Sequence, residues 1–285
     1  MKKRLVLIMA FIIVISMSLS TMAFEEVRNF SMEVEMTDVL SIETGAGKLL
    51  IEQVDSIDSI EIEAVIRVEN VSNDELTKVL NEDLRLNLER NGNIVHLRSQ
   101  FSNNIVTSGF LNFLFGGTTQ KYVDVYIKTP LVERIRIDDS SGDIVLAGIS
   151  TELYLKDGSG EIELTECSGD WTIDDGSGDI FIDNFRGQLD IEDNSGNVNI
   201  NESLADIIID DGSGEISLDG INGNVDIKDG SGNIRVDNLS DSIEIDDGSG
   251  DIILRNIGGD VTIWDAGSGD VRLRNINGQV KNYDD

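Results

Sequence analysis

The sequence predicts an all-β protein whose C-terminal half is a parallel β-solenoid (β-helix) of 18-residue turns. Two observations carry this prediction: a glycine-rich tetrad recurs every 18 residues, and apolar residues fall at the same positions in each repeat. A fixed period of this kind is typical of repeat folds, in which each unit buries its apolar face against the next. The tetrad, Asp-Gly-Ser-Gly or a close variant, begins at Asp157, Asp175, Asp193, Asp211, Asp229 and Asp247.

Within each repeat, apolar residues alternate with polar ones over short stretches that end at glycine. Such period-2 alternation of β-branched residues predicts short strands. One column of equivalent positions holds Ile144, Ile162, Ile180, Val198, Ile216, Ile234, Ile252 and Val271. Strands this short cannot bury a face alone, so we expect successive turns to stack about 4.8 Å apart in two parallel sheets.

Two positions in the repeats allow more specific predictions. Cys167 falls in a further inward column, so we expect a buried core residue and not a reactive thiol. One extra residue breaks the 18-residue spacing near Ala266 and Gly267, which predicts a bulge in the last full turn.

Residues 24–136 predict an irregular, β-rich N-terminal cap that contains a short helix. Several segments alternate like strands, and Asn73-Asp74-Glu75 is expected to cap a helix that runs through Leu80. We expect this region to cover the N-terminal end of the solenoid, because an open sheet edge invites pairing. The predicted organisation is therefore a signal peptide over 1–23, the cap region over 24–136 and the solenoid repeats over 137–285.

The first 23 residues predict export. Lys2, Lys3 and Arg4 precede an apolar run to about Ile15, and small and polar residues end at Ala23, as in a cleaved signal peptide. An uncleaved anchor is the alternative, although the apolar run is short for a span of about 20 residues. The mature chain is expected to have no transmembrane span and to be secreted, periplasmic or associated with the cell surface.

The composition limits the classes of partner. Lys and Arg number 22 against 54 Asp and Glu, and removing the leader's three basic residues leaves 19 − 54 = −35. A surface this acidic repels nucleic acid and anionic lipid but accepts cations and basic partners. The single cysteine excludes an internal disulfide framework despite the expected oxidising compartment.

The tetrad aspartates form a ladder with one carboxylate per turn, and two interpretations of it are open. Each carboxylate can cap its own turn by accepting amide N–H bonds, or Ca²⁺ can lie between successive turns. The candidates for calcium ligands are Asp157, Asp175, Asp193, Asp211, Asp229 and Asp247. The period is similar to the calcium-binding nonapeptide repeat, but isoleucines such as Ile162 stand where that repeat has its liganding Asp, which favours turn capping without a cofactor.

A second candidate is the stretch from Ser99 to Gln120, which has no charged residue in a chain that is 27% charged. Its apolar members are Phe110, Leu111, Phe113, Leu114 and Phe115. They form either a loop folded under the cap or an exposed patch that contacts a partner or a membrane surface.

The order of segments resembles the bacterial "putative adhesin" family, a domain of unknown function made of β-strand repeats. The resemblance rests on the leader, the irregular strand region with a helix, the strand Val123 to Pro130, and the Ser-Gly-Asp-Ile units that begin at Ser141. It implies a secreted or cell-envelope β-solenoid and supplies no catalytic or ligand residues.

The sequence therefore favours a non-enzymatic scaffold that binds an envelope, protein or glycan partner through its surface. A calcium-stabilised structural spacer is one alternative, and a polysaccharide-active β-helix enzyme is another. The enzyme is disfavoured because its carboxylates would have to gather on long loops, whereas these are spread along one corner. His96 is the sole histidine and lies far from any Ser or Cys motif.

Overall fold

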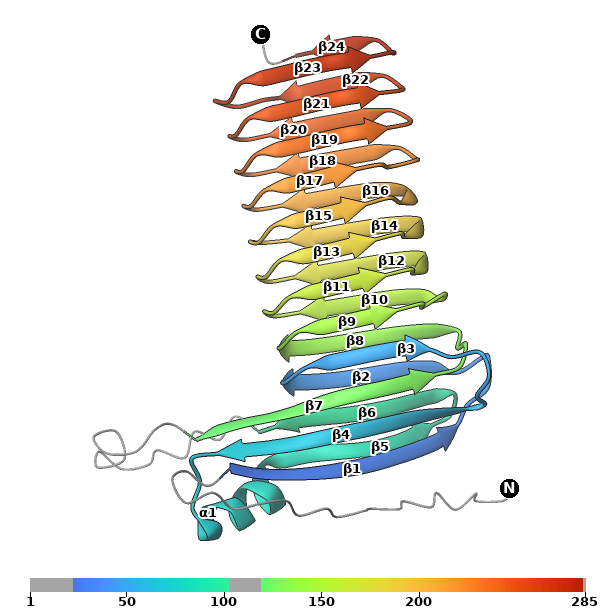
Figure 1. Cartoon of the computed structure of the whole chain (residues 1–285), viewed down its shortest axis with the longest axis vertical. Coiled ribbons are helices and arrows are strands. Elements are labelled where there is room, and N and C mark those ends of the chain that lie inside the picture. Colours follow the sequence, from blue (N-terminus) through green and yellow to red (C-terminus); the bar gives the residue numbers. More distant parts are fainter. Residues whose placement is uncertain (1–22, 103–118, 284–285) are drawn as a thin grey trace, which may run out of the picture. The chain divides into compact units, whose positions relative to one another are not determined.

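The computed structural model describes residues 23–102 and 119–283, which divide into two compact units. The first contains the described residues up to Glu133 together with Asp139–Gly142, and the second contains Arg134–Asp138 and the chain from Asp143 onward. Strands account for nearly all regular structure in both units, with one short helix (Figure 1). The predicted all-β class and the parallel solenoid of 18-residue turns are confirmed. The role of residues 24–136 as a cap stays a prediction.

In the N-terminal unit, four neighbouring strands of one sheet follow the order β1-β4-β7-β3. Strand β4 (Ser59–Glu69) pairs antiparallel with both β1 (Ala23–Glu33) and β7 (Gln120–Thr129), and β3 (Leu49–Gln53) pairs parallel with β7. Along β4, Ile60, Ile62 and Ile66 are buried while Glu61 and Glu63 are exposed. One face of this sheet therefore belongs to the core and the other faces solvent.

The second sheet of this unit contains β2 (Val39–Ala46), β6 (Ile94–Phe101) and β5 (Leu84–Asn91). Before β5, α1 (Asn73–Lys78) continues into a π-helical turn, η1 (Val79–Asp83). The expected cap at Asn73 is wrong by one residue, because Ser72 is the N-cap. Its hydroxyl accepts the Glu75 amide while the Glu75 carboxylate accepts the Ser72 amide, which forms a capping box.

The solenoid unit consists of two all-parallel sheets whose strands alternate along the chain (Figure 1). One sheet contains β9 (Ile144–Ala147), β11 (Ile162–Thr165), β13 (Ile180–Asp183), β15 (Val198–Asn201), β17 (Ile216–Asp219), β19 (Ile234–Leu239), β21 (Ile252–Ile257) and β23 (Val271–Ile276). The other contains β8 (Arg134–Ser141), β10 (Glu152–Asp157), β12 (Ser168–Asp175), β14 (Arg186–Asp193), β16 (Leu204–Asp211), β18 (Val225–Asp229), β20 (Ile243–Asp247), β22 (Val261–Asp265) and β24 (Val280–Asn282). Residues 18 apart are paired before the last turn, as in Leu189 with Ile207, and residues 19 apart are paired within it, as in Ile252 with Val271.

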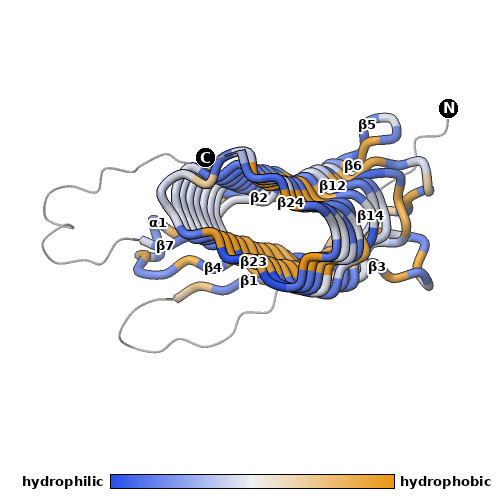
Figure 2. Tube along the Cα trace, turned by 90° about the horizontal axis from the view of Figure 1, so that it is seen from above, coloured by the Kyte–Doolittle hydropathy of each residue, from blue (hydrophilic) through white to orange (hydrophobic). Residues whose placement is uncertain are grey.

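The solenoid core is the set of columns that the sequence predicts. Figure 2, viewed along the stacking axis, shows the backbone of the successive turns superposed as a flattened ring. The inward side chains of these turns are buried. Cys167 is buried as expected, and burial raises the pKa of its thiol to about 11. The Trp171 indole packs edge-on against Phe185 at 5.2 Å and donates from Nε1 to the Thr151 carbonyl at 2.8 Å.

The glycines of the repeat are required by the close stacking of turns. At Gly196 the backbone has a φ of +150°, and a Cβ there would lie 1.6 Å from the Gly178 carbonyl oxygen of the preceding turn. No side chain fits at that distance, so the fourth position of the tetrad is glycine in each turn from Gly160 to Gly250.

The predicted irregularity in the last turn is present, two residues earlier than expected. Ile245 pairs with Ile263 but Asp246 pairs with Asp265, so Trp264 is the additional residue. Its exposed ring stacks on Tyr283 at 4.9 Å. Asp265 is consequently exposed while Ala266 is buried, and the buried aspartate column ends at Asp247.

Candidate functional site

The tetrad aspartates lie inside the solenoid. Each is at the end of a strand in the sheet formed by the even-numbered strands from β8 to β24. Their side chains are at most 3% exposed, because the alternation that turns the preceding apolar residues inward does the same to the aspartates. In every one, Oδ1 accepts the amide N–H of the serine two residues on, at 2.9 to 3.3 Å. This is the turn-capping geometry that the sequence favours.

The second carboxylate oxygen has a different environment. Oδ2 is buried and has no hydrogen-bond partner within 23–102 and 119–283 in Asp175, Asp193, Asp211, Asp229 and Asp247. Burial, and then the charges of Asp157 and Asp193, raise the pKa of Asp175 to about 7. Burial is also the main reason why the pKa values of Asp211, Asp229 and Asp247 rise to about 6.

The tetrad aspartates alone supply too few oxygen ligands for a calcium site. Ca²⁺ takes six to eight oxygen ligands, whereas two successive turns offer one carboxylate each. In the described part of the chain, no three His, Cys, Asp or Glu side chains gather where they could hold a metal ion. The calcium sites at Asp157, Asp175, Asp193, Asp211, Asp229 and Asp247 stay a prediction, beside the observed turn caps.

A second candidate is a shallow groove of about 570 Å³ on the solvent face of the β1-β4-β7-β3 sheet. We call it the sheet groove. Two neighbouring cross-strand rows supply its solvent-facing side chains, because the strand register places them side by side. The rows are Asn29-Glu63-Tyr126-Leu50 and Ser31-Glu61-Lys128-Glu52, in the strand order β1, β4, β7, β3.

The charged groups of the sheet groove are not paired with one another. Glu61 lies directly opposite Lys128, which in turn lies beside Glu52, yet the described residues form no ion pair or hydrogen bond with these side chains or with Glu63. Tyr126 is 36% exposed, and Leu50 is half-buried next to it. The groove thus combines three solvated carboxylates, one ammonium group and an accessible aromatic ring.

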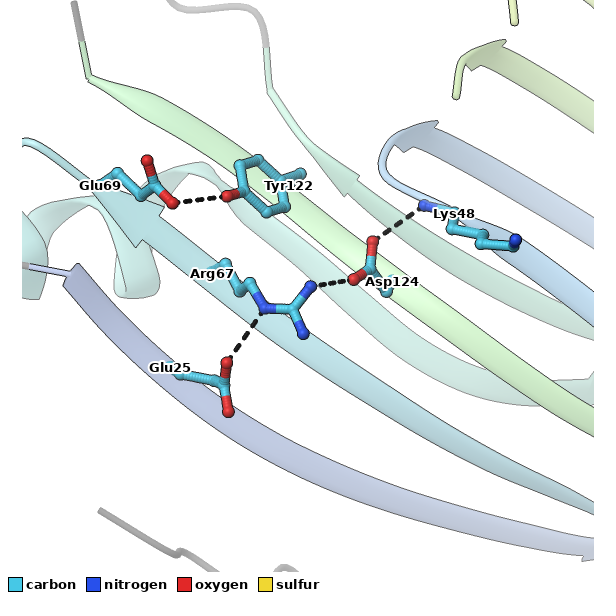
Figure 3. A network of polar contacts seen from close by, with 6 residues as sticks. All are labelled: Glu25, Lys48, Arg67, Glu69, Tyr122 and Asp124. Carbon is cyan, nitrogen blue, oxygen red and sulfur yellow. Dashed lines mark hydrogen bonds and ion pairs between the residues drawn. The ribbon is translucent and has the colours of Figure 1, made fainter. Parts of the chain in front are cut away.

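Farther along the strands, the same sheet face carries two sets of hydrogen-bonded polar groups, which Figure 3 shows. Arg67 donates from Nε to Glu25 at 3.0 Å and from Nη1 to Asp124, whose other oxygen accepts the Lys48 amide at 2.9 Å. Tyr122 donates to Glu69 at 2.7 Å, which raises the pKa of the phenol. These polar groups are paired with one another, whereas the charged groups of the sheet groove have no such partners among the described residues.

Sequence reasoning did not find the sheet groove. Its residues come from four strands between positions 29 and 128, and β1 was not recognised as a strand because only one of its eleven residues, Met32, is buried. The Phe110, Leu111, Phe113, Leu114 and Phe115 segment lies outside the described residues. The described chain has no helix of sufficient length and apolarity to cross a membrane.

Comparison with known proteins shows to which family the chain belongs. A family model described as Toastrack DUF4097 matches residues 56–237 and, again, 186–284. The chain belongs to the Toastrack family. This confirms the resemblance to β-strand repeat proteins of unknown function, and no curated protein matches the chain.

Solved structures similar to this Toastrack chain are described as "putative adhesins". One from Parabacteroides distasonis is 12% identical with a TM-score of 0.36, and covers 90% of this chain and 97% of its own. Another from Bacteroides fragilis is 10% identical with a TM-score of 0.34, with the same coverage. A third, from Parabacteroides merdae, is 13% identical with a TM-score of 0.33 and covers 90% and 95%. Values this low do not transfer a role to this chain.

Proposed function

We propose that this protein is a non-enzymatic, exported Toastrack module that binds envelope or extracellular partners through its outer surfaces. The observation that carries the proposal is the filled interior of the solenoid. Apolar columns such as Ile191 and Ile209 are no more than about 1% exposed, and they leave no room for a ligand between the sheets. Binding must then use the outer faces or the N-terminal unit.

The outward positions of the solenoid support extended contact. They vary from turn to turn, from Glu163 and Phe181 on consecutive strands to Asn199 and Ser217 on the next two. A column this mixed offers no repeated array of one side chain and no gathered catalytic pair. The one carboxylate column of the described solenoid that continues unbroken from Asp157 to Asp247 is buried, where substrates do not reach.

Export is the second part of the proposal, and it rests on the leader-like residues 1–23 and the acidic surface. The full chain should be expressed in a bacterium, fractionated, and analysed by mass spectrometry for removal of the leader. The purified product should then be incubated with isolated envelope material and with a cytosolic extract. We expect a processed N-terminus and selective retention by the envelope material. An unprocessed cytoplasmic chain, or equal retention by both materials, would overturn the proposal.

The competing function is the calcium-stabilised spacer, because the buried Oδ2 atoms are carboxylate oxygens, the type of ligand that Ca²⁺ prefers. It differs in two measurable ways. A spacer would bind Ca²⁺ in a calorimetric titration and would show no envelope retention with or without the cation. The proposed binding module should be retained by envelope material in the presence of a chelator.

A further inference from the structure

The sheet groove has the features of a ligand site that is set apart from the rest of its sheet face. Charges on that face at Glu25, Arg67 and Asp124 neutralise one another through hydrogen bonds (Figure 3). Those at Glu61 and Glu63 have no partner in the described residues, and both are exposed. Three carboxylates against the single ammonium of Lys128 leave the groove with an excess of negative charge.

The strand geometry fixes the spacing of these charges. Glu61 and Glu63 are two residues apart on β4 and point to the same face, so their Cα atoms are about 6.8 Å apart. An extended peptide has the same spacing between side chains on one face. Two basic side chains at positions i and i+2 would therefore both reach a carboxylate, whereas adjacent basic residues would point to opposite faces.

Tyr126 adds a contact that a simple charge patch lacks. Its Cα is paired with that of Glu63 across β4 and β7, and its ring is accessible beside half-buried Leu50. The aliphatic stem of a lysine or the plane of an arginine packs on such a ring while the charged end reaches the neighbouring carboxylate. The volume of about 570 Å³ lies within the usual range of ligand sites.

We propose that the sheet groove binds an extended peptide segment with two basic side chains two residues apart, held by Glu61, Glu63 and Tyr126. This inference rests on the proposed binding function and names the partner chemistry of one surface. Glu52 favours the binding of such a peptide by adding negative charge beside Lys128, whereas the positive charge of Lys128 disfavours it. The net charge of −32 draws basic partners toward the protein without selecting among them, and the groove supplies the selection.

The test uses the full chain and fluorescence anisotropy with two labelled heptapeptides of equal composition. One is Ser-Gly-Lys-Ser-Lys-Gly-Ser, and the other has its two lysines adjacent. The Lys-Ser-Lys peptide should bind more tightly than its isomer. In Glu61→Gln/Glu63→Gln its affinity should fall about fivefold to tenfold, as expected for loss of two solvent-screened ion pairs. Tyr126→Ala should weaken it as well.

Two further variants separate site binding from general attraction. Glu163→Gln/Glu192→Gln changes the net charge equally at exposed positions of the solenoid, and its affinity should stay at the wild-type value. Lys128→Gln should tighten binding, which no loss of folding would produce. Circular dichroism and thermal melting establish that each variant is folded.

Several results would overturn the inference. Equal affinities for the two peptides, equal losses in the two double Glu variants, or weaker binding in Lys128→Gln would show attraction to net charge alone. Preferential binding of a glucosamine tetramer at the same ionic strength would assign the groove to an amino sugar. Because envelope retention is measured separately, its persistence in Glu61→Gln/Glu63→Gln would refute the groove as the main surface and leave the proposed function standing.

Discussion

The buried aspartate ladder predicts an unusual response to pH, and Asp211→Asn tests it. Asp211 is 1% exposed, its Oδ1 accepts the Ser213 amide at 3.0 Å, and its Oδ2 has no hydrogen-bond partner in the described chain. An asparagine oxygen can keep the turn-capping bond. The substitution removes a buried charge and places N–H donors where the adjacent turns present the Oδ2 atoms of Asp193 and Asp229, which have no donor among the described residues.

The magnitude follows from the shifted pKa. Burial raises the pKa of Asp211 from 3.8 to about 6, and each pH unit corresponds to about 1.4 kcal/mol. At pH 8, the ionisation of Asp211 therefore lowers the free energy of unfolding by about 3 kcal/mol. If the new amide hydrogens are imperfectly satisfied, about 1–2 kcal/mol of that gain is offset. We expect Asp211→Asn to be more stable than wild type at pH 8 by about 1–3 kcal/mol, or about 2–4 °C of Tm for each kcal/mol.

The direction of the pH dependence is fixed by the sign of the shift. Folded Asp211 holds its proton more tightly than the unfolded chain does, so its contribution to stability is fully present below pH 3.8 and is lost as the pH rises through about 6. The advantage of the variant should shrink between pH 8 and pH 4. Carboxylates with a lowered pKa, such as Glu43 beside Arg98, lose stability in acid in both proteins and cancel in the difference.

The assay is thermal unfolding by circular dichroism from pH 4 to pH 8. Asp190→Asn is the matched control. Asp190 is exposed on β14, so this substitution removes the same charge outside the core. Its difference from wild type should be small at every pH. A variant Asp211→Asn that is less stable than wild type at pH 8, or whose advantage does not change with pH, would refute the reasoning.

The remaining predictions concern the core, the cation and the uncharged segment. Ile209→Asp should cost several kcal/mol because it buries an unpaired charge, whereas Ile208→Asp, at a neighbouring position that is 52% exposed, should be nearly neutral in urea unfolding. The β-sheet circular dichroism should persist in EDTA, and its loss with recovery in Ca²⁺ would replace turn capping by calcium binding. Phe110→Ser/Phe113→Ser/Phe115→Ser should weaken envelope retention with an unchanged Tm, and an unfolded triple variant would place these residues in a core instead.

The solenoid could be predicted from sequence because its contacts are periodic. Once Leu189 and Ile207 occupy the same position in consecutive repeats, pairing them requires no information beyond the spacing of 18. The failures lie where that period is broken. Trp264 was not recognised as the inserted residue, since the spacing shows that one residue is extra and local backbone geometry decides which one bulges.

The N-terminal unit was harder to predict because its pairings are not periodic. Strand β3 pairs with β7, more than 70 residues later, and nothing in either segment identifies the other. The sheet groove depends on that register: a shift of one residue in β4 would turn Glu61 and Glu63 into the core. Individual strands other than β1 were therefore predictable here, whereas the juxtaposition of Glu63 with Tyr126 was not.

The inward and outward positions of this protein are under different structural constraints. An inward residue of the solenoid meets similar neighbours in every turn, so one solution repeats. It includes a carboxylate whose second oxygen, in Asp175, Asp211 and Asp247, has no hydrogen-bond partner in the part of the chain that the structure describes. That repetition makes the ladder a poor source of specificity, because no turn differs from the next. Outward positions carry no such restriction, and specificity must arise where side chains differ. The sheet groove satisfies this condition, since its two rows occur once in the described chain and bring together groups from four strands.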